Sequence, residues 1–332
     1  MKHKVAINGL GRIGRAALKI IREDPGLELT AVNDLVPLEN LVYLLRYDSV
    51  YGRYEREVRP EGGHLTVGGE KVTFLQEKDP AQLPWKEMEV DLVFECTGVF
   101  TEKEDMAKHI QAGAGRVILS APSKSKEVVT VVHGVSQGEE TPAEIVSCAS
   151  CTTNCIAPVV EVMGRRLGIR KAIMTTVHAY TSSQQIVDGP SKKLRRGRAG
   201  AINFVPTSTG AAKATTKVLP AYKGKFDGVA IRAPIAVGSI ADMVFLTEKA
   251  ASAEEINRIF REESQSERYR SILGVTSEPL VSTDIIKDTR ASIVDLSMTQ
   301  VVDGDLVKIM SWYDNEWGYS CQMIREAHAM LG

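Results

Sequence analysis

The stretch NGLGRIG, residues 8–14, follows a short apolar run and precedes a segment with helical spacing of its apolar residues. Its glycines, Gly9, Gly11 and Gly14, have the G-x-G-x-x-G spacing of a dinucleotide-binding turn. Gly9 permits a tight turn, Gly11 lets a pyrophosphate approach the backbone, and Gly14 lets the helix pack closely on the strand. The start of the helix offers free N–H groups and a positive dipole to an anion. The stretch predicts a dinucleotide site, against the alternative of an ordinary glycine turn.

An acidic residue occurs at the end of the second predicted strand, the position of a ribose-binding carboxylate in dinucleotide sites. Asp34 ends the next apolar run, LELTAVND (27–34), twenty residues after Gly14. A carboxylate at the end of this strand can accept hydrogen bonds from an adenosine ribose, and it repels a 2′-phosphate. The glycine turn and the acid together favour NAD over NADP as the cofactor.

Apolar runs and helix-like segments alternate through the first half of the chain. Repeated β-α-β units predict a parallel, doubly wound sheet of the Rossmann type. The expected strands are 5–9, 27–34, 90–98 and 115–122; the expected helices are 12–24, 40–47 and 102–113; a hairpin is expected over 64–75, turning at Gly68-Gly69.

The pattern of predicted elements changes after residue 150, where the expected strands are longer. Expected strands are 172–181, 228–237, 239–248, 291–304 and 305–314, with helices over 151–168 and 253–265 and a last helix over 316–331. This pattern predicts an α+β domain with a largely antiparallel sheet. We therefore expect an α/β protein of two domains: a NAD-binding domain, 1–150, completed by the C-terminal helix 316–332, and a catalytic domain, 151–315.

Bulk properties narrow the class of protein. A chain of 332 residues suits two domains. A formal net charge of −1 gives no overall attraction to nucleic acid or an anionic membrane. No apolar run reaches the roughly 18 residues of a membrane span, and MKHKVAING has no signal-peptide apolar region. Five cysteines, an odd number, argue against a secreted disulfide scaffold, so we expect a reducing, cytoplasmic location.

The stretch SCASCTTNC, residues 147–155, contains three of the five cysteines. Structural zinc prefers two such cysteine pairs or added histidines, but there is no second pair and the nearest histidine, His133, is far back in the sequence. A disulfide is disfavoured in a reducing compartment. Cys151 lies at the start of a predicted helix, where the dipole stabilises a thiolate and a backbone N–H can meet an oxyanion. Cys148 and Cys155 fit the role of small buried hydrophobes. Cys151 is therefore the candidate nucleophile.

A nucleophilic thiol needs a base or a counter-ion nearby. His178 ends the strand-like run TTVHA, 27 residues after Cys151, and a helix followed by a strand can bring it back over the helix start. A lone histidine is more often structural, but beside such a cysteine the acid/base role is favoured.

Seven motifs, NGLGRIGR, ND, SCTTNC, TTVHAYT, LRR, PTSTGAAKA and WYDNEWGY, occur in this order. With them the chain resembles, over essentially its whole length, the phosphorylating glyceraldehyde-3-phosphate dehydrogenases. The resemblance implies oxidative phosphorylation of D-glyceraldehyde 3-phosphate to 1,3-bisphosphoglycerate with NAD, through a hemithioacetal and a thioester on Cys151, with His178 as acid/base. It also implies a homotetramer.

The same resemblance implies the binding residues. Those that hold the dinucleotide are Gly9, Gly11, Arg12, Ile13, Gly14, Asp34, Thr97, Ser120 and Asn315, the last through the nicotinamide carboxamide. The resemblance assigns binding of the substrate phosphate to Thr181 and Arg232. It assigns binding of inorganic phosphate to Ser150, Thr152, Thr209 and Gly210, with Arg196 near. No metal is expected.

Two departures from the family pattern concern these phosphate sites. Many bacterial members have an acidic residue where this chain has Ser183, and a hydroxyl there retunes phosphate binding without abolishing it. After Arg232 the chain runs APIAVGSIAD in place of the commoner VPTPNVSVVD, which affects the nearby strand and not the arginine. Gly189-Pro190 resembles the NAD-using members.

The long irregular segment 182–210 contains a basic cluster, Lys192, Lys193, Arg195, Arg196 and Arg198. A long loop inside a compact domain is usually functional. Attraction of the anionic substrate together with subunit contact is the favoured role, against a solvated charged face or nucleic-acid binding. No aromatic residues interleave with the arginines, so no dedicated nucleic-acid partner is expected.

Three other functions compete with the favoured one. The nearest is the same chemistry on erythrose 4-phosphate, and the intact TSTGAAKA favours glyceraldehyde 3-phosphate over it. A semialdehyde or acyl-phosphate reductase also uses cysteine and histidine on a dinucleotide fold. A nucleotide-binding regulator or RNA-binding protein without turnover predicts a degraded Cys-His pair, whereas both residues are present here.

Overall fold

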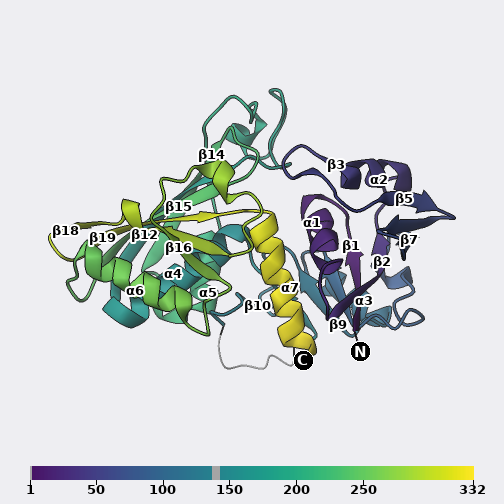
Figure 1. Cartoon of the computed structure of the whole chain (residues 1–332), viewed down its shortest axis with the longest axis horizontal. Helices are drawn as coiled ribbons and strands as arrows, with labels where there is room; N and C mark the ends of the chain where they lie inside the picture. Colours follow the sequence, from purple (N-terminus) through teal and green to yellow (C-terminus); the bar gives the residue numbers. More distant parts are fainter. Residues whose placement is uncertain (1, 137–142) are drawn as a thin grey trace. The chain divides into compact units, whose positions relative to one another are not determined.

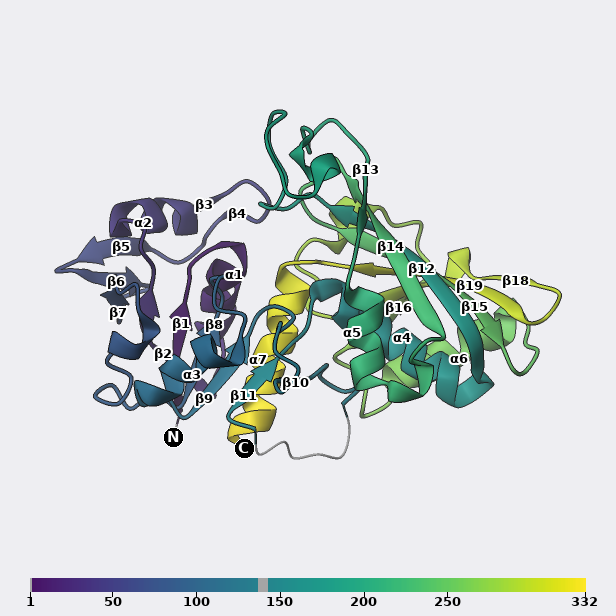
Figure 2. The same ribbon diagram turned by 180° about the vertical axis from the view of Figure 1, so that it is seen from behind.

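The computed structural model describes residues 2–136 and 143–332, which form two compact units. Within these residues, the first unit comprises 2–131, 143–149 and 323–332, and the second comprises 132–136 and 150–322. Figures 1 and 2 show them from opposite sides. Among the described helices, none combines the length and the apolar character needed to cross a membrane.

The first unit is built on one sheet with the strand order β10-β11-β9-β8-β1-β2-β7-β6-β5. β1 lies between β2 and β8, and both pairings are parallel. Strands are added on both sides of the central strand β1, which confirms the predicted doubly wound parallel sheet. At one end β7, β6 and β5 pair antiparallel, and the predicted hairpin turns at Gly68-Gly69.

The elements of the first unit have the following bounds. The strands of the sheet are β1 (His3–Asn8), β2 (Leu27–Asn33), β5 (Val58–Glu61), β6 (His64–Val67), β7 (Glu70–Leu75), β8 (Leu92–Glu95), β9 (Arg116–Leu119), β10 (Val129–Thr130) and β11 (Ile145–Ser147). A two-stranded ribbon joins β3 (Tyr47–Asp48) and β4 (Gly52–Arg53), and the helices are α1 (Arg12–Ile21), α2 (Leu38–Arg46) and α3 (Lys103–Gln111).

Helix α1 shows how the sequence forms these elements. Of the apolar residues whose helical spacing predicts a buried face, Ala16, Ala17 and Ile21 are buried, while Ile13 and Ile20 are half-buried. The helix ends before the predicted residue 24. The Asp24 carboxylate there accepts backbone N–H bonds from the two residues after Pro25, and this closes a turn into β2.

The second unit is built on a mixed sheet with the order β13-β14-β12-β15-β19-β17-β16, while β18 pairs with β19. Most pairings are antiparallel, as predicted, but β12 with β14 and β16 with β17 are parallel. The helices α4, α5 and α6 pack on the sheet and on one another. Figure 1 shows α6 below β12, β15 and β19, and Figure 2 shows α5 beside β14.

The elements of the second unit have the following bounds. The strands are β12 (Ile169–Ala179), β13 (Val205–Ser208), β14 (Phe226–Ala233), β15 (Ser239–Thr247), β16 (Leu273–Thr276), β17 (Ser292–Asp295), β18 (Gln300–Val302) and β19 (Leu306–Tyr313). The helices are α4 (Cys151–Leu167), α5 (Ala211–Val218), α6 (Ala253–Gln265) and α7 (Trp317–Leu331). The residues of α7 from 323 onward belong to the first unit.

Two parts of the second unit differ from the sequence prediction. The strand expected over 291–304 is broken into β17 and β18, because the Asp295 carboxylate accepts the backbone N–H of Ser297 and turns the chain. The segment 182–210, expected to be irregular, ends in strand β13, and helix α5 follows it.

One face of the mixed sheet is covered by helices and the other is not. Residues along β15 alternate between buried and half-buried, the period-two pattern of a sheet with one covered face. Ile173 on β12 and Val229 on β14 are 62% and 52% exposed. Apolar side chains on the uncovered face of the sheet are therefore open to solvent in the single chain.

Candidate active site

The glycine turn between β1 and α1 is tight at two of its three glycines. Gly9 has a φ of +92°, and a Cβ there would lie 2.7 Å from the Thr97 nitrogen. A Cβ on Gly14 would lie 1.9 Å from the carbonyl oxygen of Gly9, so helix and strand meet too closely for any side chain. A Cβ on Gly11 would meet nothing within 4 Å. The open space at Gly11 is where the predicted pyrophosphate requires it.

A cavity of about 790 Å³ opens at this turn, at the carboxyl ends of the central strands. Its lining is Asn8, Gly9, Gly11, Asn33, Asp34, Leu35, Glu77, Lys78, Asp79, Pro80, Cys96, Thr97, Val99, Phe100 and Lys108. The Asp34 carboxylate accepts backbone N–H bonds from Leu10 at 2.6 Å and from Val36 at 3.0 Å. It is thus held rigidly in the place that the sequence predicts for a ribose-binding acid.

Of the other predicted coenzyme residues of this unit, Thr97 lines the cavity. Within the described chain, Arg12, Ile13, Gly14 and Ser120 are not part of its lining. The Arg12 guanidinium pairs with Asp48 at 2.7 Å, so its side chain is already engaged. A contribution of Arg12 to anion binding would come from its backbone N–H, at the start of α1.

A buried polar network beneath the cavity was not predicted from the sequence. The Glu95 carboxylate accepts the backbone N–H of Thr97 at 2.8 Å and the Asn8 amide at 2.6 Å. His109 accepts the indole N–H of Trp85 at Nδ1, at 3.0 Å, so its hydrogen lies on Nε2 and faces Glu95 at 3.2 Å. Glu95 thereby fixes two residues of the cavity lining. Its position in an otherwise apolar strand is the sequence feature that could have revealed it.

In the second unit, Cys151 is the first residue of α4 and lies against the end of β12. Its Sγ is 3.3 Å from Nε2 of His178, so the predicted pair is in contact. Ser150 caps α4, because its Oγ accepts the backbone N–H of Thr153 at 3.1 Å.

The protonation of this pair differs from the sequence prediction of a dipole-stabilised thiolate. Burial raises the pKa of the Cys151 thiol above its ordinary value, although the charge of Arg232 and the helix-start N–H groups oppose the rise. Burial, reinforced by Arg232, lowers the pKa of His178 to about 3. At neutral pH the structure therefore favours a neutral thiol beside a neutral imidazole. For Cys155, one turn further along, burial raises the pKa to about 12.

The far side of the His178 ring is held by two groups. Nδ1 lies 2.7 Å from the carbonyl oxygen of Ala179 and lies against Arg232 Nη1, which can only donate and which donates to the same oxygen at 3.0 Å. A ring nitrogen either donates or accepts. With the hydrogen on Nδ1 it donates to Ala179, and the lone pair of Nε2 then faces the sulfur.

Tyr313 links the thiol helix to the histidine strand. Its hydroxyl bonds to Thr152 Oγ1 at 2.9 Å and to Thr176 Oγ1 at 2.8 Å, and its ring meets that of His178 edge-on, with centroids 5.9 Å apart. Burial raises the pKa of Tyr313, so it stays a neutral hydrogen-bonding clamp. The Thr152 hydroxyl is thus engaged inside the protein.

Two arginines stand near the thiol. Burial lowers the pKa of Arg232, as does the positive charge of Arg196 to a smaller degree, and burial lowers the pKa of Arg196 itself. Two arginines that repel each other and act on His178 form a cationic region that a bound anion would stabilise. The Nε of Arg232 is buried without a hydrogen-bond partner in the described part of the chain.

The remaining predicted phosphate residues belong to the same unit. Thr181 Oγ1 bonds to Ser183 Oγ at 2.8 Å, and Arg196 Nε donates to Thr207 Oγ1 at 3.0 Å. Thr209 Oγ1 accepts the backbone N–H of Ala211 at 3.2 Å, and Gly210 is the residue at the start of α5. Within the described residues, neither Thr209 nor Gly210 forms a hydrogen bond with Arg196, although Arg196 Nη2 donates to the carbonyl oxygen of the adjacent Ser208 at 3.4 Å, so their shared role stays a prediction.

Asn315 follows β19 and is 5% exposed. Its Oδ1 accepts a hydrogen bond from Ser239 Oγ at 2.8 Å. Ser239 in turn accepts the backbone N–H of Ala179, the residue after His178, at 3.1 Å.

Two family models match the chain. Residues 150–315 match the C-terminal domain of glyceraldehyde 3-phosphate dehydrogenase, and residues 3–103 match its NAD binding domain. The chain belongs to the glyceraldehyde-3-phosphate dehydrogenase family. The predicted NAD cofactor and two-part α/β fold are confirmed by these matches, and the open space at Gly11 beside Asp34 fits a dinucleotide.

Relatives of similar length support the assignment to this dehydrogenase family. The chain is 46% identical to the glyceraldehyde-3-phosphate dehydrogenase of Geobacillus stearothermophilus over 326 residues, which cover 98% of this chain and 97% of the relative. It is 45% identical to the enzyme of that name from Zymomonas mobilis, over 99% of both chains. The chloroplastic glyceraldehyde-3-phosphate dehydrogenase A of Chlamydomonas reinhardtii is also 45% identical, over 97% of this chain and 87% of the relative.

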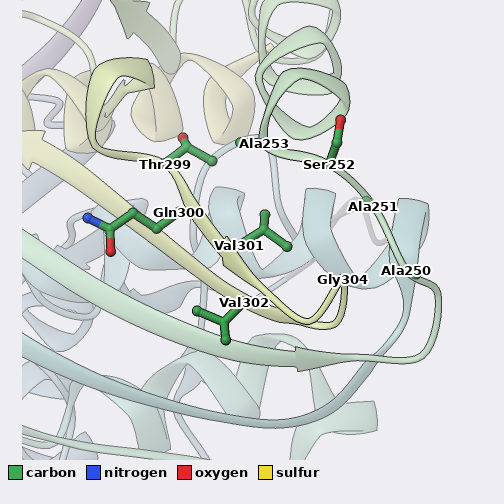
Figure 3. A pocket seen from close by; sticks show the side chains of 9 residues that line it. All are labelled: Ala250, Ala251, Ser252, Ala253, Thr299, Gln300, Val301, Val302 and Gly304. Carbon is green, nitrogen blue, oxygen red and sulfur yellow. The ribbon is translucent and has the colours of Figure 1, made fainter.

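A second large cavity of this dehydrogenase has no reactive or charged side chains in its lining. A cavity of about 820 Å³ lies between the start of α6 and the β18–β19 hairpin (Figure 3). Its lining, drawn there, consists of Ala250, Ala251, Ser252, Ala253, Thr299, Gln300, Val301, Val302 and Gly304, without a titratable side chain. Across residues 2–136 and 143–332 no cluster of three metal-ligating side chains forms, and all five cysteines are free thiols.

Proposed function

We propose that the chain oxidises D-glyceraldehyde 3-phosphate with NAD and inorganic phosphate, giving 1,3-bisphosphoglycerate. The observation that carries the proposal is the 3.3 Å contact between Cys151 Sγ and His178 Nε2 at the start of α4, beside Arg232. In this contact a thiol faces a base inside a cationic environment, as covalent aldehyde oxidation requires. The family models and the names of the relatives support the substrate.

The first step needs a base, because the half-buried thiol is neutral. With its hydrogen on Nδ1 held by the Ala179 carbonyl, His178 accepts the thiol proton at Nε2 while the sulfur bonds to the aldehyde carbon. The developing oxyanion is met by the backbone N–H of Cys151. The oxyanion then takes this proton back from His178, so the product is a hemithioacetal on Cys151 and His178 is again a neutral base.

Oxidation then turns the hemithioacetal into a thioester. NAD, when bound, accepts the hydride from the substrate carbon. His178 takes the hydroxyl proton as the C–O double bond re-forms, so the proton and the hydride leave separately. Its low pKa makes the resulting imidazolium a ready acid.

The last step releases the product from the sulfur. Phosphate attacks the thioester carbon, the C–S bond breaks, and the departing sulfur recovers its proton from His178. Two anion sites are needed, and we assign the substrate phosphate to Thr181 and Arg232. Inorganic phosphate is assigned to Arg196 with Ser150, Thr152, Thr209 and Gly210. The two mutually repelling arginines support an anion at each place.

The remaining expectations extend this proposal. We assign coenzyme binding to residues 1–150 with 316–332 and catalysis to 151–315. The exposed apolar residues of the second unit support a homotetramer: Ile186, Val187, Leu194, Ile202 and Phe204 are each at least 70% exposed. Such apolar exposure is typical of a subunit interface. A cytoplasmic location is proposed from the odd number of thiols.

Anion dependence of turnover tests the proposal. Purified protein should reduce NAD with glyceraldehyde 3-phosphate when phosphate or arsenate is present, because the thioester otherwise blocks the sulfur. Absorbance at the wavelength of the reduced coenzyme reports the rate. Equal steady-state rates without either anion would rule out the phosphorylating reaction, and a higher kcat/KM for erythrose 4-phosphate would select the alternative substrate.

A further inference from the structure

A single serine hydroxyl ties the end of the histidine strand to Asn315. Ser239 is the first residue of β15 and is fully buried. The backbone N–H of Ala179 donates to its Oγ at 3.1 Å, and Oγ lies 2.8 Å from Asn315 Oδ1. The hydroxyl therefore joins three segments that are far apart in the sequence.

The direction of these two hydrogen bonds is fixed by chemistry. A backbone N–H can only donate, so Ser239 Oγ is the acceptor in the bond from Ala179. The Asn315 atom that faces Oγ is the amide oxygen Oδ1, which can only accept, so the hydroxyl donates its single hydrogen to it. The Asn315 amide is thus turned with Oδ1 toward Ser239 and Nδ2 away from it.

The two N–H donors of Asn315 Nδ2 are left without an acceptor in the described residues. Across residues 2–136 and 143–332, Nδ2 of Asn315 has no hydrogen-bond partner, although the residue is only 5% exposed. The backbone around it is held as well, because the Asp314 carboxylate accepts the N–H groups of Glu316 at 2.9 Å and Trp317 at 2.8 Å. A rigid, nearly buried amide that presents only donors is suited to a carbonyl oxygen of a ligand.

We propose that Ser239 is a positioning residue that sets the orientation of the Asn315 amide. In this orientation Asn315 donates from Nδ2 to the carbonyl oxygen of the coenzyme carboxamide and does not accept from the carboxamide NH₂. The inference rests on the proposed function, in which Asn315 holds the carboxamide. It adds that Ser239 decides which half of the carboxamide is recognised.

A coenzyme analogue tests the orientation in the unmodified enzyme. 3-Acetylpyridine adenine dinucleotide keeps the carbonyl oxygen and replaces the NH₂ by a methyl group. If Asn315 donates, the wild-type enzyme binds this analogue within about threefold of NAD in an equilibrium fluorescence titration. A Kd weaker than that of NAD by tenfold or more would show that the NH₂ is recognised, and the proposed orientation would be wrong.

Substitution of Ser239 tests its role directly. Ser239→Ala frees the amide to turn, and the Kd for NAD should rise about tenfold, equivalent to about 1.4 kcal/mol. The KM for glyceraldehyde 3-phosphate and the alkylation rate of Cys151 should stay within twofold. Ser239→Thr keeps a hydroxyl and should restore the wild-type Kd.

Ser311→Ala is the matched control. It removes another fully buried serine hydroxyl of the same sheet, bonded to Ser292 at 2.7 Å. It should lower thermal stability without changing the Kd for NAD. An unchanged Kd in Ser239→Ala, or an equal loss in both alanine variants, overturns the inference. If the wild-type enzyme itself binds no NAD, the proposed function fails as well, so the two failures are distinguishable.

Discussion

The starts of α1 and α4 are two uses of the same structural element. Each presents free backbone N–H groups and the positive end of a helix dipole. At α1 the capping position is Gly11, which makes no side-chain cap and would leave a Cβ with nothing within 4 Å. At α4 the capping position is Ser150, whose hydroxyl fills the first turn, and the next residue is the thiol of Cys151.

The two helix starts differ in the group that lies against their backbone N–H groups. The open start at Gly11 leaves room for a group that the protein does not contain, a phosphate carried by the coenzyme. The start of α4 is occupied by the protein's own side chains and presents a sulfur atom, with His178 in contact and Arg232 beside it. A helix start without a cap or side chains suits ligand binding, whereas a capped start that presents a half-buried thiol suits covalent chemistry.

Cys151→Ser should break the chemistry of the second helix start and leave the first intact. A hydroxyl is far harder to deprotonate than a thiol, so kcat should fall by at least about 10³-fold. The Kd for NAD should stay within twofold. Steady-state rates and a coenzyme titration on the same preparation measure both.

Cys155→Ser is the control for that substitution. Cys155 is fully buried one turn further along α4, and its sulfur contacts Ser292 and not His178. We expect activity within about threefold of wild type. Comparable losses in the two serine variants would contradict the assignment of Cys151 as the nucleophile.

Gly11→Ala should act on the first helix start alone. The φ of Gly11 is −65°, which alanine adopts without strain, so the variant should fold. Its methyl group would occupy the space of the pyrophosphate, and the Kd for NAD should rise about 100-fold, or about 2.7 kcal/mol. The alkylation rate of Cys151 by iodoacetamide, measured without coenzyme, should not change.

Gly14→Ala is the contrasting variant at the same turn. Its Cβ would lie 1.9 Å from the Gly9 carbonyl oxygen, so helix and strand must separate. We expect a large loss of thermal stability in place of a selective loss of coenzyme affinity. If Gly11→Ala melted as early as Gly14→Ala, the open space at Gly11 would not be a ligand site.

The sequence predicts these helix starts better than it predicts their surroundings. Two features of the sequence are local: the glycines at fixed spacing, and the cysteine between polar residues at a helix start. Each reflects what the turn or helix start that contains it requires. The Glu95–His109–Trp85 network is not local, because it depends on which faces of a strand, a helix and a loop meet in the fold.

The protonation of Cys151 was missed for the same reason. The dipole at the start of α4 is a local property, and alone it predicts a lowered pKa. Burial is a tertiary property, and it outweighs the dipole. The break at Asp295, by contrast, is a local turn whose sequence, Asp-Leu-Ser, lies inside the strand predicted over 291–304.

The pH dependence of stability sharpens the contrast between the open and the buried helix start. His178 has its pKa lowered to about 3 in the folded chain, whereas an unfolded histidine titrates near 6.5. Between these values the unfolded state binds the extra proton, so the free energy of unfolding falls as pH falls from about 6.5 toward 3. At pH 5 the loss from this residue is about 2 kcal/mol.

His178→Asn cannot bind that proton and should not show this part of the loss. Urea unfolding of both proteins at pH 7.5 and pH 5 measures it, with the pH 7.5 difference as the reference. The other titrating groups cancel when the two proteins are compared, because their surroundings are shared. Wild type should lose about 2 kcal/mol more than His178→Asn between the two pH values. Equal losses would mean that His178 takes up its proton as readily in the folded chain as in water, and the neutral thiol–imidazole pair at the start of α4 would be wrong.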